Sequence, residues 1–179
     1  MKICFRYSLP LVFSALIFFQ GTASLAAKKD LSYGNFTKVR FIKNYDGDTI
    51  TVDLKGQHPL FGDDIPVRVA GIDTPEIRGK CAQEKALARE AKGVVEKVLK
   101  KARRITLKNV QRGKYFRILA DVQADKQNLA DILIEKGLAV RYDGGTKGFD
   151  WCSRKAKRMR EAGGKGGPTW EHFLDKILH

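Results

Sequence analysis

The chain has 179 residues, with 34 Lys and Arg against 20 Asp and Glu and a formal charge of +14 at pH 7. This length allows one ordinary domain with a real hydrophobic core and leaves no room for a large multidomain enzyme. So basic a protein suits polyanions such as nucleic acid, anionic membrane or cell-wall polymer, because surface cations displace counterions from phosphates.

The N-terminus has the pattern of a signal peptide. Lys2 and Arg6 precede an apolar run over residues 9–19, and the small residues Ser-Leu-Ala-Ala follow at 24–27. The run is shorter than the about 20 residues that a spanning helix needs. We predict that residues 1–27 are removed during export to a periplasm or out of the cell, which leaves no transmembrane span. An uncleaved membrane anchor is the alternative.

Alternating hydrophobic residues predict strands in the first half of the remaining chain. Residues 38–43 alternate, and so do residues 50–54. Asp46-Gly47 lies between them, and two alternating runs joined through Asp-Gly are a strong hairpin signal. A third strand is predicted from Ile65 to Ile72.

The hydrophobic period then changes from strand to helix. Apolar residues at helical spacing predict an amphipathic helix over residues 82–102. Two strands follow, around residues 104–110 and 115–124. A second helix is predicted from an N-cap at Asn128 to Gly137 at its C-terminal end.

This order of elements predicts an α+β fold that is mainly β: a five-stranded OB-fold Greek-key barrel with packed helices. A split sheet packed with helices is the alternative. We place the domain at residues 28–162, with a basic helix over residues 150–161. A Gly-rich linker and a short amphipathic tail follow at residues 163–179. A fold alone does not give a function.

Three charged segments lie at or near the ends of predicted strands. They read Asp-Gly-Asp-Thr at 46–49, Arg-Val-Ala-Gly-Ile-Asp-Thr-Pro-Glu at 68–76, and Lys-Tyr-Phe-Arg at 114–117. Each alone has an ordinary explanation: a hairpin turn, a proline-led turn with solvated charges, or an exposed cation on an edge strand. Asp48 fits such an explanation less well, because a turn needs only one of its two acids.

In this order, and around an OB-like strand pattern, the three segments resemble the staphylococcal nuclease (thermonuclease) family. The similarity covers roughly residues 37–142 and is strongest at the motifs. The resemblance implies a metal-dependent phosphodiesterase that cleaves the P–O5′ bond of DNA and RNA and leaves 3′-phosphate ends.

The resemblance also implies a calcium site. Asp48 and Asp73 would bind Ca2+ through carboxylate oxygens, and the backbone carbonyl of Thr74 would be a further ligand. Hard oxygen ligands with few protein carboxylates suit calcium, with waters and a substrate phosphate in the remaining positions.

Three further residues would carry the chemistry if the resemblance holds. Glu76 would orient or deprotonate the attacking water. Arg68 and Arg117 would grip the phosphate with their planar guanidinium groups and stabilise the charge that builds on it. A phosphodiester repels hydroxide, so the site must neutralise the phosphate, polarise it and position water.

Substrate contacts are expected from Lys114, Tyr115 and Tyr142. Either tyrosine could hold a phosphate or stack on a base. Packing in the core or at its rim is the alternative for Tyr142, and Lys114 would add only local positive potential. The chain departs from the family at Phe116, where the family has Gly, and in a shorter segment after Glu76.

The expected export affects the interpretation of the cysteines, because an exported protein enters an oxidising compartment. Cys4 leaves with the signal peptide, and Cys81 and Cys152 remain as a pair in an oxidising compartment. We predict a disulfide between them, with two unpaired thiols as the alternative. The bridge would tie the loop that follows Glu76 to the C-terminal helix.

Three classes of function compete. The first is a calcium-dependent nuclease acting on DNA and RNA as a monomer, with no stable protein partner. The second is a non-catalytic OB-type module that binds nucleic acid or another polyanion, and the third is an exported envelope-associated protein. A pure binder does not need Asp48, Asp73 and Glu76 beside a phosphate, which they would repel without a metal. The sequence therefore favours the nuclease.

Overall fold

The computed structural model describes residues 32–113 and 117–165. The expected signal peptide lies outside the described residues, as do Lys114, Tyr115 and most of the expected C-terminal tail. The boundaries drawn for these segments therefore stay predictions.

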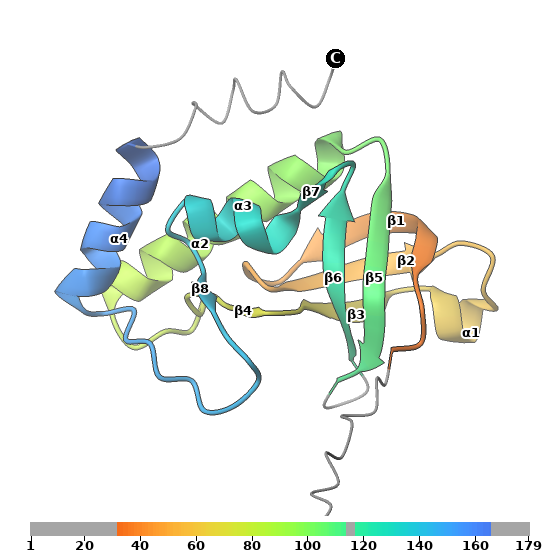
Figure 1. Cartoon of the computed structure of the whole chain (residues 1–179), viewed down its shortest axis with the longest axis horizontal. Helices are drawn as coiled ribbons and strands as arrows, with labels where there is room; N and C mark the ends of the chain where they lie inside the picture. Colours follow the sequence, from red (N-terminus) through yellow and green to blue (C-terminus); the bar gives the residue numbers. More distant parts are fainter. Residues whose placement is uncertain (1–31, 114–116, 166–179) are drawn as a thin grey trace, which may run out of the picture. The chain divides into compact units, whose positions relative to one another are not determined.

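Five strands close into a barrel (Figure 1): β1 (Phe36–Asn44), β2 (Thr49–Leu54), β3 (Ile65–Val69), β5 (Ile105–Arg112) and β6 (Ile118–Ala124). Strand β1 pairs antiparallel with β2 and β5, β2 pairs antiparallel with β3, and β5 pairs antiparallel with β6. The parallel pairing of β3 with β6 closes the ring. A short strand, β7 (Gln127–Asn128), extends the sheet beside β6. The expected OB-type barrel is confirmed.

The barrel forms because alternate residues of its strands are apolar and point inward. Ile50 and Val52 of β2 are buried, and so are Val67 and Val69 of β3, whereas Arg68 between them is only partly buried. This period of two is the one that a half-buried strand requires.

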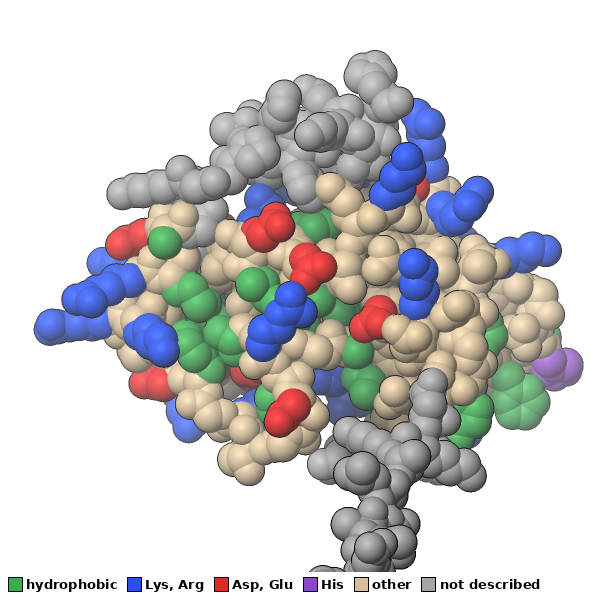
Figure 2. Space-filling view, in the orientation of Figure 1, with side chains coloured by type: hydrophobic (Ala, Val, Ile, Leu, Met, Phe, Trp, Pro, Cys, Tyr) green, Lys and Arg blue, Asp and Glu red, His purple; other side chains and the backbone are tan. Residues whose placement is uncertain are grey.

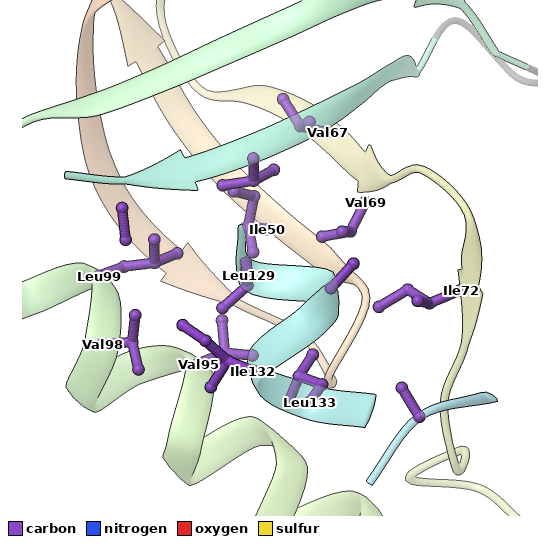
Figure 3. Packing of buried hydrophobic residues seen from close by; sticks show 14 of the residues in the cluster. Ile50, Val67, Val69, Ile72, Val95, Val98, Leu99, Leu129, Ile132 and Leu133 are labelled. Atoms are coloured by element: carbon purple, nitrogen blue, oxygen red, sulfur yellow. The ribbon is translucent and has the colours of Figure 1, made fainter. Parts of the chain in front are cut away.

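Two helices pack against the barrel and complete the hydrophobic core. Helix α2 (Ala82–Lys101) and helix α3 (Leu129–Glu135) present their apolar faces to the strands. Figure 3 shows these faces meeting residues of β2 and β3, with Val95, Val98 and Leu99 from α2 and Leu129, Ile132 and Leu133 from α3. The sequence predicts both helices, because their apolar stripes have a helical period.

The helix ends follow the expected signals. The Asn128 side chain caps α3 by accepting a hydrogen bond from the N–H of Ala130 at 2.8 Å, and Gly137 after the helix has φ +65°. Residues 150–153 form a turn instead of a helix, so α4 (Arg154–Lys165) begins later than predicted. It continues past residue 163, where we expected the linker. A further short helix is α1 (Pro59–Gly62).

The third strand is shorter than predicted. Strand β3 ends at Val69, because Gly71 adopts φ +76°, a left-handed conformation that favours glycine. The chain resumes as β4 (Ile72–Asp73), which pairs antiparallel with β8 (Val140–Arg141) and leaves the barrel sheet. This small ladder brings Asp73 beside the segment that follows β8. Among the described helices, none is both long and apolar enough to cross a membrane.

One buried carboxylate stabilises the barrel away from this ladder. Oδ1 of Asp53 in β2 accepts a hydrogen bond from the backbone N–H of Asp64 at 3.1 Å, and its Oδ2 accepts one from Nε of Arg40 at 3.0 Å. These contacts hold the pKa of Asp53 below its usual value, with the Asp64 N–H as the largest cause. A carboxylate with a lowered pKa stabilises the fold at neutral pH, and this contribution is lost as pH falls through the folded-state pKa.

We expect Asp53→Asn to lower the midpoint of thermal unfolding at neutral pH, because an amide cannot replace the charged acceptor of these bonds. The difference from wild type should shrink below about pH 4, where the native carboxylate also becomes protonated. Calorimetry across this range measures the effect. Asp63→Asn, on an exposed carboxylate nearby, is the control, and a difference independent of pH would contradict the assignment.

Candidate active site

The turn between β1 and β2 places Asp48 at one end of the barrel. Asp46 is buried, and its Oδ1 accepts hydrogen bonds from the backbone N–H groups of Asp48 at 3.1 Å and Thr49 at 2.8 Å. The Asn44 side chain donates to the Asp46 carbonyl at 2.9 Å and to the Lys92 carbonyl in α2 at 3.0 Å. The turn is thereby fixed both internally and against the helix.

Gly47 is required in this turn by close packing. A Cβ atom at this position would lie 2.9 Å from Cβ of Ala91 and 3.0 Å from Cγ2 of Thr74. Real side chains do not approach so closely, so the backbone of the turn lies directly against α2 and against the residue that follows Asp73. The two acidic motifs therefore meet through this glycine.

Arg68 joins the two aspartates that were predicted to bind metal. Strand pairing sets Thr49 opposite Arg68, and the N–H of Val69 donates to the Asp48 carbonyl at 2.8 Å. Nη1 of Arg68 lies 2.5 Å from Oδ1 of Asp48, and its Nη2 lies 3.9 Å from Oδ1 of Asp73. The register of the β2–β3 pair thus places the guanidinium between the two carboxylates.

A lysine outside the predicted set completes the cluster. Nζ of Lys147 lies 2.7 Å from Oδ1 of Asp73 and 2.5 Å from Oε1 of Glu76. The side chains of Glu76 and Lys147 are 45% and 41% exposed, whereas that of Asp73 is only 5% exposed. On its other side, Oδ2 of Asp73 accepts a hydrogen bond from Nε1 of buried Trp151 at 3.2 Å.

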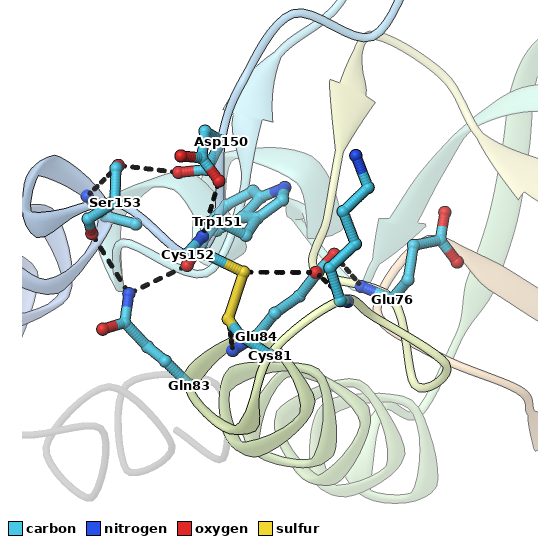
Figure 4. The surroundings of a disulfide bond; sticks show 10 residues. Glu76, Cys81, Gln83, Glu84, Asp150, Trp151, Cys152 and Ser153 are labelled. Atoms are coloured by element: carbon cyan, nitrogen blue, oxygen red, sulfur yellow. Dashed lines mark hydrogen bonds between the residues drawn. A yellow bond between two sulfur atoms is a disulfide. The ribbon is translucent and has the colours of Figure 1, made fainter.

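The loop that carries Glu76 is folded around another carboxylate, Glu84 in the first turn of α2 (Figure 4). Glu84 accepts hydrogen bonds from the backbone N–H groups of Lys80 at 2.7 Å and Glu76 at 3.4 Å. A Cβ atom at Gly79 would lie 2.3 Å from Cδ of Glu84, so the backbone passes directly over this carboxylate. Glu84 therefore sets the path of the loop.

A disulfide joins Cys81 to Cys152 next to this loop, with Cα atoms 6.0 Å apart. The Gln83 side chain reinforces the junction by donating to the carbonyls of Trp151 at 2.8 Å and Ser153 at 3.1 Å. Cys81, Glu84 and Cys152 lie close enough together to suggest a metal site, but the bridge leaves neither cysteine a thiolate to offer. The pair instead ties the Glu76 loop to the segment that carries Lys147 and Trp151.

The electrostatics of the cluster favour a bound cation. Burial and the neighbouring Asp46 raise the pKa of Asp48 to about 6, although Arg68 and Lys147 act in the opposite direction. Burial also raises the pKa of Asp46. Burial alone would lower the pKa of Lys147, but its close contacts with the carboxylates of Asp73 and Glu76 raise it above its usual value. The positive charges present do not fully offset the burial of these acids.

The predicted ligands fit a hard divalent cation. Oδ2 of Asp48 is buried and has no hydrogen-bond partner within the described part of the chain, and Oδ1 of Asp73 has ion pairs but no well-aligned hydrogen bond. Thr74, whose carbonyl was the third predicted ligand, is buried directly after Asp73. Oxygen donors of this kind suit calcium.

An open hollow of about 650 Å³ adjoins the cluster. Its walls include Asp73, Lys147, Arg141 and Tyr142. The Tyr142 hydroxyl donates to the Gly145 carbonyl at 2.5 Å, so the ring belongs to the wall of the hollow. On the face seen in Figure 2, Lys and Arg side chains are dispersed, with Asp and Glu between them. The described residues on this face form no single concentrated basic patch.

A family model for staphylococcal nuclease homologues matches residues 66–163, which is more than half of the chain. The chain belongs to the staphylococcal nuclease family. No curated protein matched it. Membership supports a nuclease-type or nucleic-acid-binding function. The matched region includes Arg68, Asp73 and Glu76 but begins after Asp48, whose place in the site rests on the β2–β3 register.

The structure brings together four of the five residues predicted to form the core of the site: Asp48, Arg68, Asp73 and Glu76. The fifth, Arg117, directly precedes β6, and its carbonyl accepts a hydrogen bond from the N–H of Gly113 at 2.7 Å. Its predicted contact with phosphate stays a prediction, as do the roles of the residues at 114 and 115.

Sequence reasoning missed three members of this staphylococcal nuclease site. Asp46 was interpreted as a turn residue, which its hydrogen bonds to Asp48 and Thr49 confirm, but its burial was not predicted. Lys147 lies in the glycine-rich stretch 143–148, whose charges look solvated in the sequence. Trp151 precedes the paired Cys152, and a tryptophan beside a cysteine pair was the available signal for a buried anchor.

Replacing Cys81 and Cys152 together by Ser should lower the free energy of unfolding by about 2–4 kcal/mol, because the bridge restrains residues that lie 71 apart in the sequence. Urea denaturation measures the loss. Reductant should destabilise wild type to a similar extent and leave the double variant unchanged. Mass spectrometry without reductant should also show the deficit of two hydrogens, and a full-mass wild type would contradict the bridge.

Proposed function

We propose that the protein is an exported, calcium-dependent nuclease that hydrolyses phosphodiester bonds of DNA and RNA and leaves 3′-phosphate ends. The observation that carries the proposal is one cluster of charges at one end of the barrel, in which Arg68 contacts Asp48 and Asp73 and Lys147 links Asp73 to Glu76. Two of these acids are buried and one is half exposed, which suits the different tasks of holding a metal and meeting water.

Asp48, Asp73 and the Thr74 carbonyl would hold the calcium ion. When bound, the ion would supply positive charge that polarises the phosphate. Arg68 would hold a phosphate oxygen through one edge of its guanidinium while the other stays on Asp48, and Arg117 would add a second cation. Glu76, on its loop beside the hollow, would accept the proton of the attacking water.

Export is supported by the N-terminal sequence pattern and by the disulfide, because disulfides persist in oxidising compartments. Removal of residues 1–27 would leave every strand and helix that the structure describes, because β1 begins at Phe36. A periplasmic or a secreted location fits equally well.

One observation favours the second candidate, a module that binds polyanions without cleaving them. Lys147 and Arg68 together offset much of the negative charge of Asp48, Asp73 and Glu76. The acids would therefore repel a phosphate less strongly in the absence of metal than the sequence alone suggests. Cleavage of a labelled substrate separates the two candidates, because only the nuclease yields shorter products.

The purified protein should cut single-stranded DNA and RNA in the presence of Ca2+, and a chelator should abolish the activity. Glu76→Gln should lower the turnover by about 10²–10⁴-fold, because the amide cannot accept a proton. A gel assay with end-group analysis measures both the rate and the 3′-phosphate.

Glu135→Gln, which makes the same change on an exposed glutamate of α3, is the matched control and should cleave like wild type. Circular dichroism should show that both variants fold. Tight binding of DNA without cleavage at any mildly alkaline pH would make the binding module the better description.

A further inference from the structure

Lys147 occupies a position that no motif assigns to a cation. Its ammonium group lies between Asp73 and Glu76, at 2.7 Å from Oδ1 of the first and 2.5 Å from Oε1 of the second. The same oxygen of Asp73, Oδ1, also forms the ion pair with Arg68 at 3.9 Å, whereas Trp151 donates to the other oxygen, Oδ2. Lys147 therefore neutralises the face of Asp73 that a metal would use.

The segment that carries Lys147 is anchored at both ends. The N–H of Tyr142 donates to the Gly71 carbonyl at 3.0 Å, directly after the β4–β8 ladder. Beyond Lys147, Trp151 is buried against Asp73, and Cys152 is bonded to Cys81. Between these anchors, residues 143–148 are exposed, and Gly144 has φ +94°. The lysine is thus tethered to the site, but its own segment is not packed in the core.

Arg68 and Lys147 differ in how firmly they are held. Arg68 lies in a paired strand, and its side chain is 18% exposed. Lys147 lies in a loop, its side chain is 41% exposed, and it borders the open hollow. A lysine is a compact charge on a flexible stem, so it can leave one partner for solvent at little cost. Of these two cations, Lys147 is the displaceable one.

An ammonium group and a calcium ion cannot use the same oxygen face together. Calcium binds carboxylate oxygens at about 2.3–2.6 Å, and the ammonium already lies 2.7 Å from Oδ1 of Asp73. Two cations packed side by side on one oxygen would also repel each other strongly in this partly buried place. Binding of one therefore requires withdrawal of the other.

We propose that Lys147 is a built-in competitor of the metal: it occupies the carboxylates of Asp73 and Glu76 while the site is metal-free, and it must withdraw when calcium binds. The inference rests on the proposed calcium site. Lys147 stabilises the metal-free protein by offsetting two carboxylates and lowers its affinity for calcium. It also holds the oxygen of Glu76 that would otherwise meet water, so the base is released when the metal enters.

The test measures calcium affinity directly, by isothermal titration calorimetry on the whole protein without substrate. Lys147→Gln should bind Ca2+ up to about fivefold more tightly than wild type, the scale of one lost ion pair. Arg141→Gln is the matched control: it removes one positive charge from the same hollow, but Arg141 pairs with Asp131. The control should change the affinity by less than about twofold, because exposed charges are screened.

Thermal unfolding, measured with and without calcium, tests whether the metal replaces Lys147 at the two carboxylates. Without calcium, Lys147→Gln should unfold at a lower temperature than wild type, because Asp73 and Glu76 lose their compensating charge. Saturating Ca2+ should remove this deficit. Lys147→Arg keeps the charge and should bind calcium no more tightly than wild type, which separates the role of charge from that of loop packing.

The outcomes distinguish this inference from the proposed function. Equal calcium affinity in Lys147→Gln and in wild type would overturn the competition and leave the calcium site standing. A calcium-bound structure that retains both contacts of Lys147 would do the same. Absence of calcium binding in every variant would remove the site itself, and the inference with it.

Discussion

The structure depends on burying negative charge at one end of a closed barrel. Asp46, Asp48 and Asp73 are nearly inaccessible to water, and a buried carboxylate is stable only when nearby donors or cations offset the loss of hydration. Asp46 accepts hydrogen bonds from backbone N–H groups, Asp48 forms an ion pair with Arg68, and Asp73 accepts a hydrogen bond from Trp151. The raised pKa of Asp48 indicates that this compensation is incomplete. An incompletely compensated cluster of oxygens is what a binding site for a divalent cation requires.

Four features of the fold bring these groups to one place. The β2–β3 register sets Arg68 beside the turn that carries Asp48, and the parallel β3–β6 pair closes the barrel around them. The break at Gly71 then turns the chain out of the barrel into the β4–β8 ladder. The disulfide fixes the far end of the same region. Segments that are distant in the sequence therefore contribute residues to one site.

The site divides into a fixed half and an adjustable half. Asp48 lies in the turn between β1 and β2, and Arg68 lies in β3, which pairs with β2, so their geometry is set by the barrel. Glu76 and Lys147 lie on loops and are close to half exposed. Glu84 and the disulfide limit how far these loops can move. Such a division suits a site that must keep its ligands in position while it exchanges one cation for another and admits a large, charged polymer.

The sequence predicted the barrel, helices α2 and α3, and the motifs that carry Asp48, Arg68, Asp73 and Glu76, because hydrophobic period and short motifs are properties of neighbouring residues in the chain. The sequence also predicted the disulfide between Cys81 and Cys152. Only the tertiary structure determines which other side chains contact the residues of the site. Lys147 reaches Asp73, which lies more than seventy residues earlier, only because the ladder and the disulfide fold its segment back. No local pattern encodes that contact, because its energy comes from charges that meet after the chain has closed.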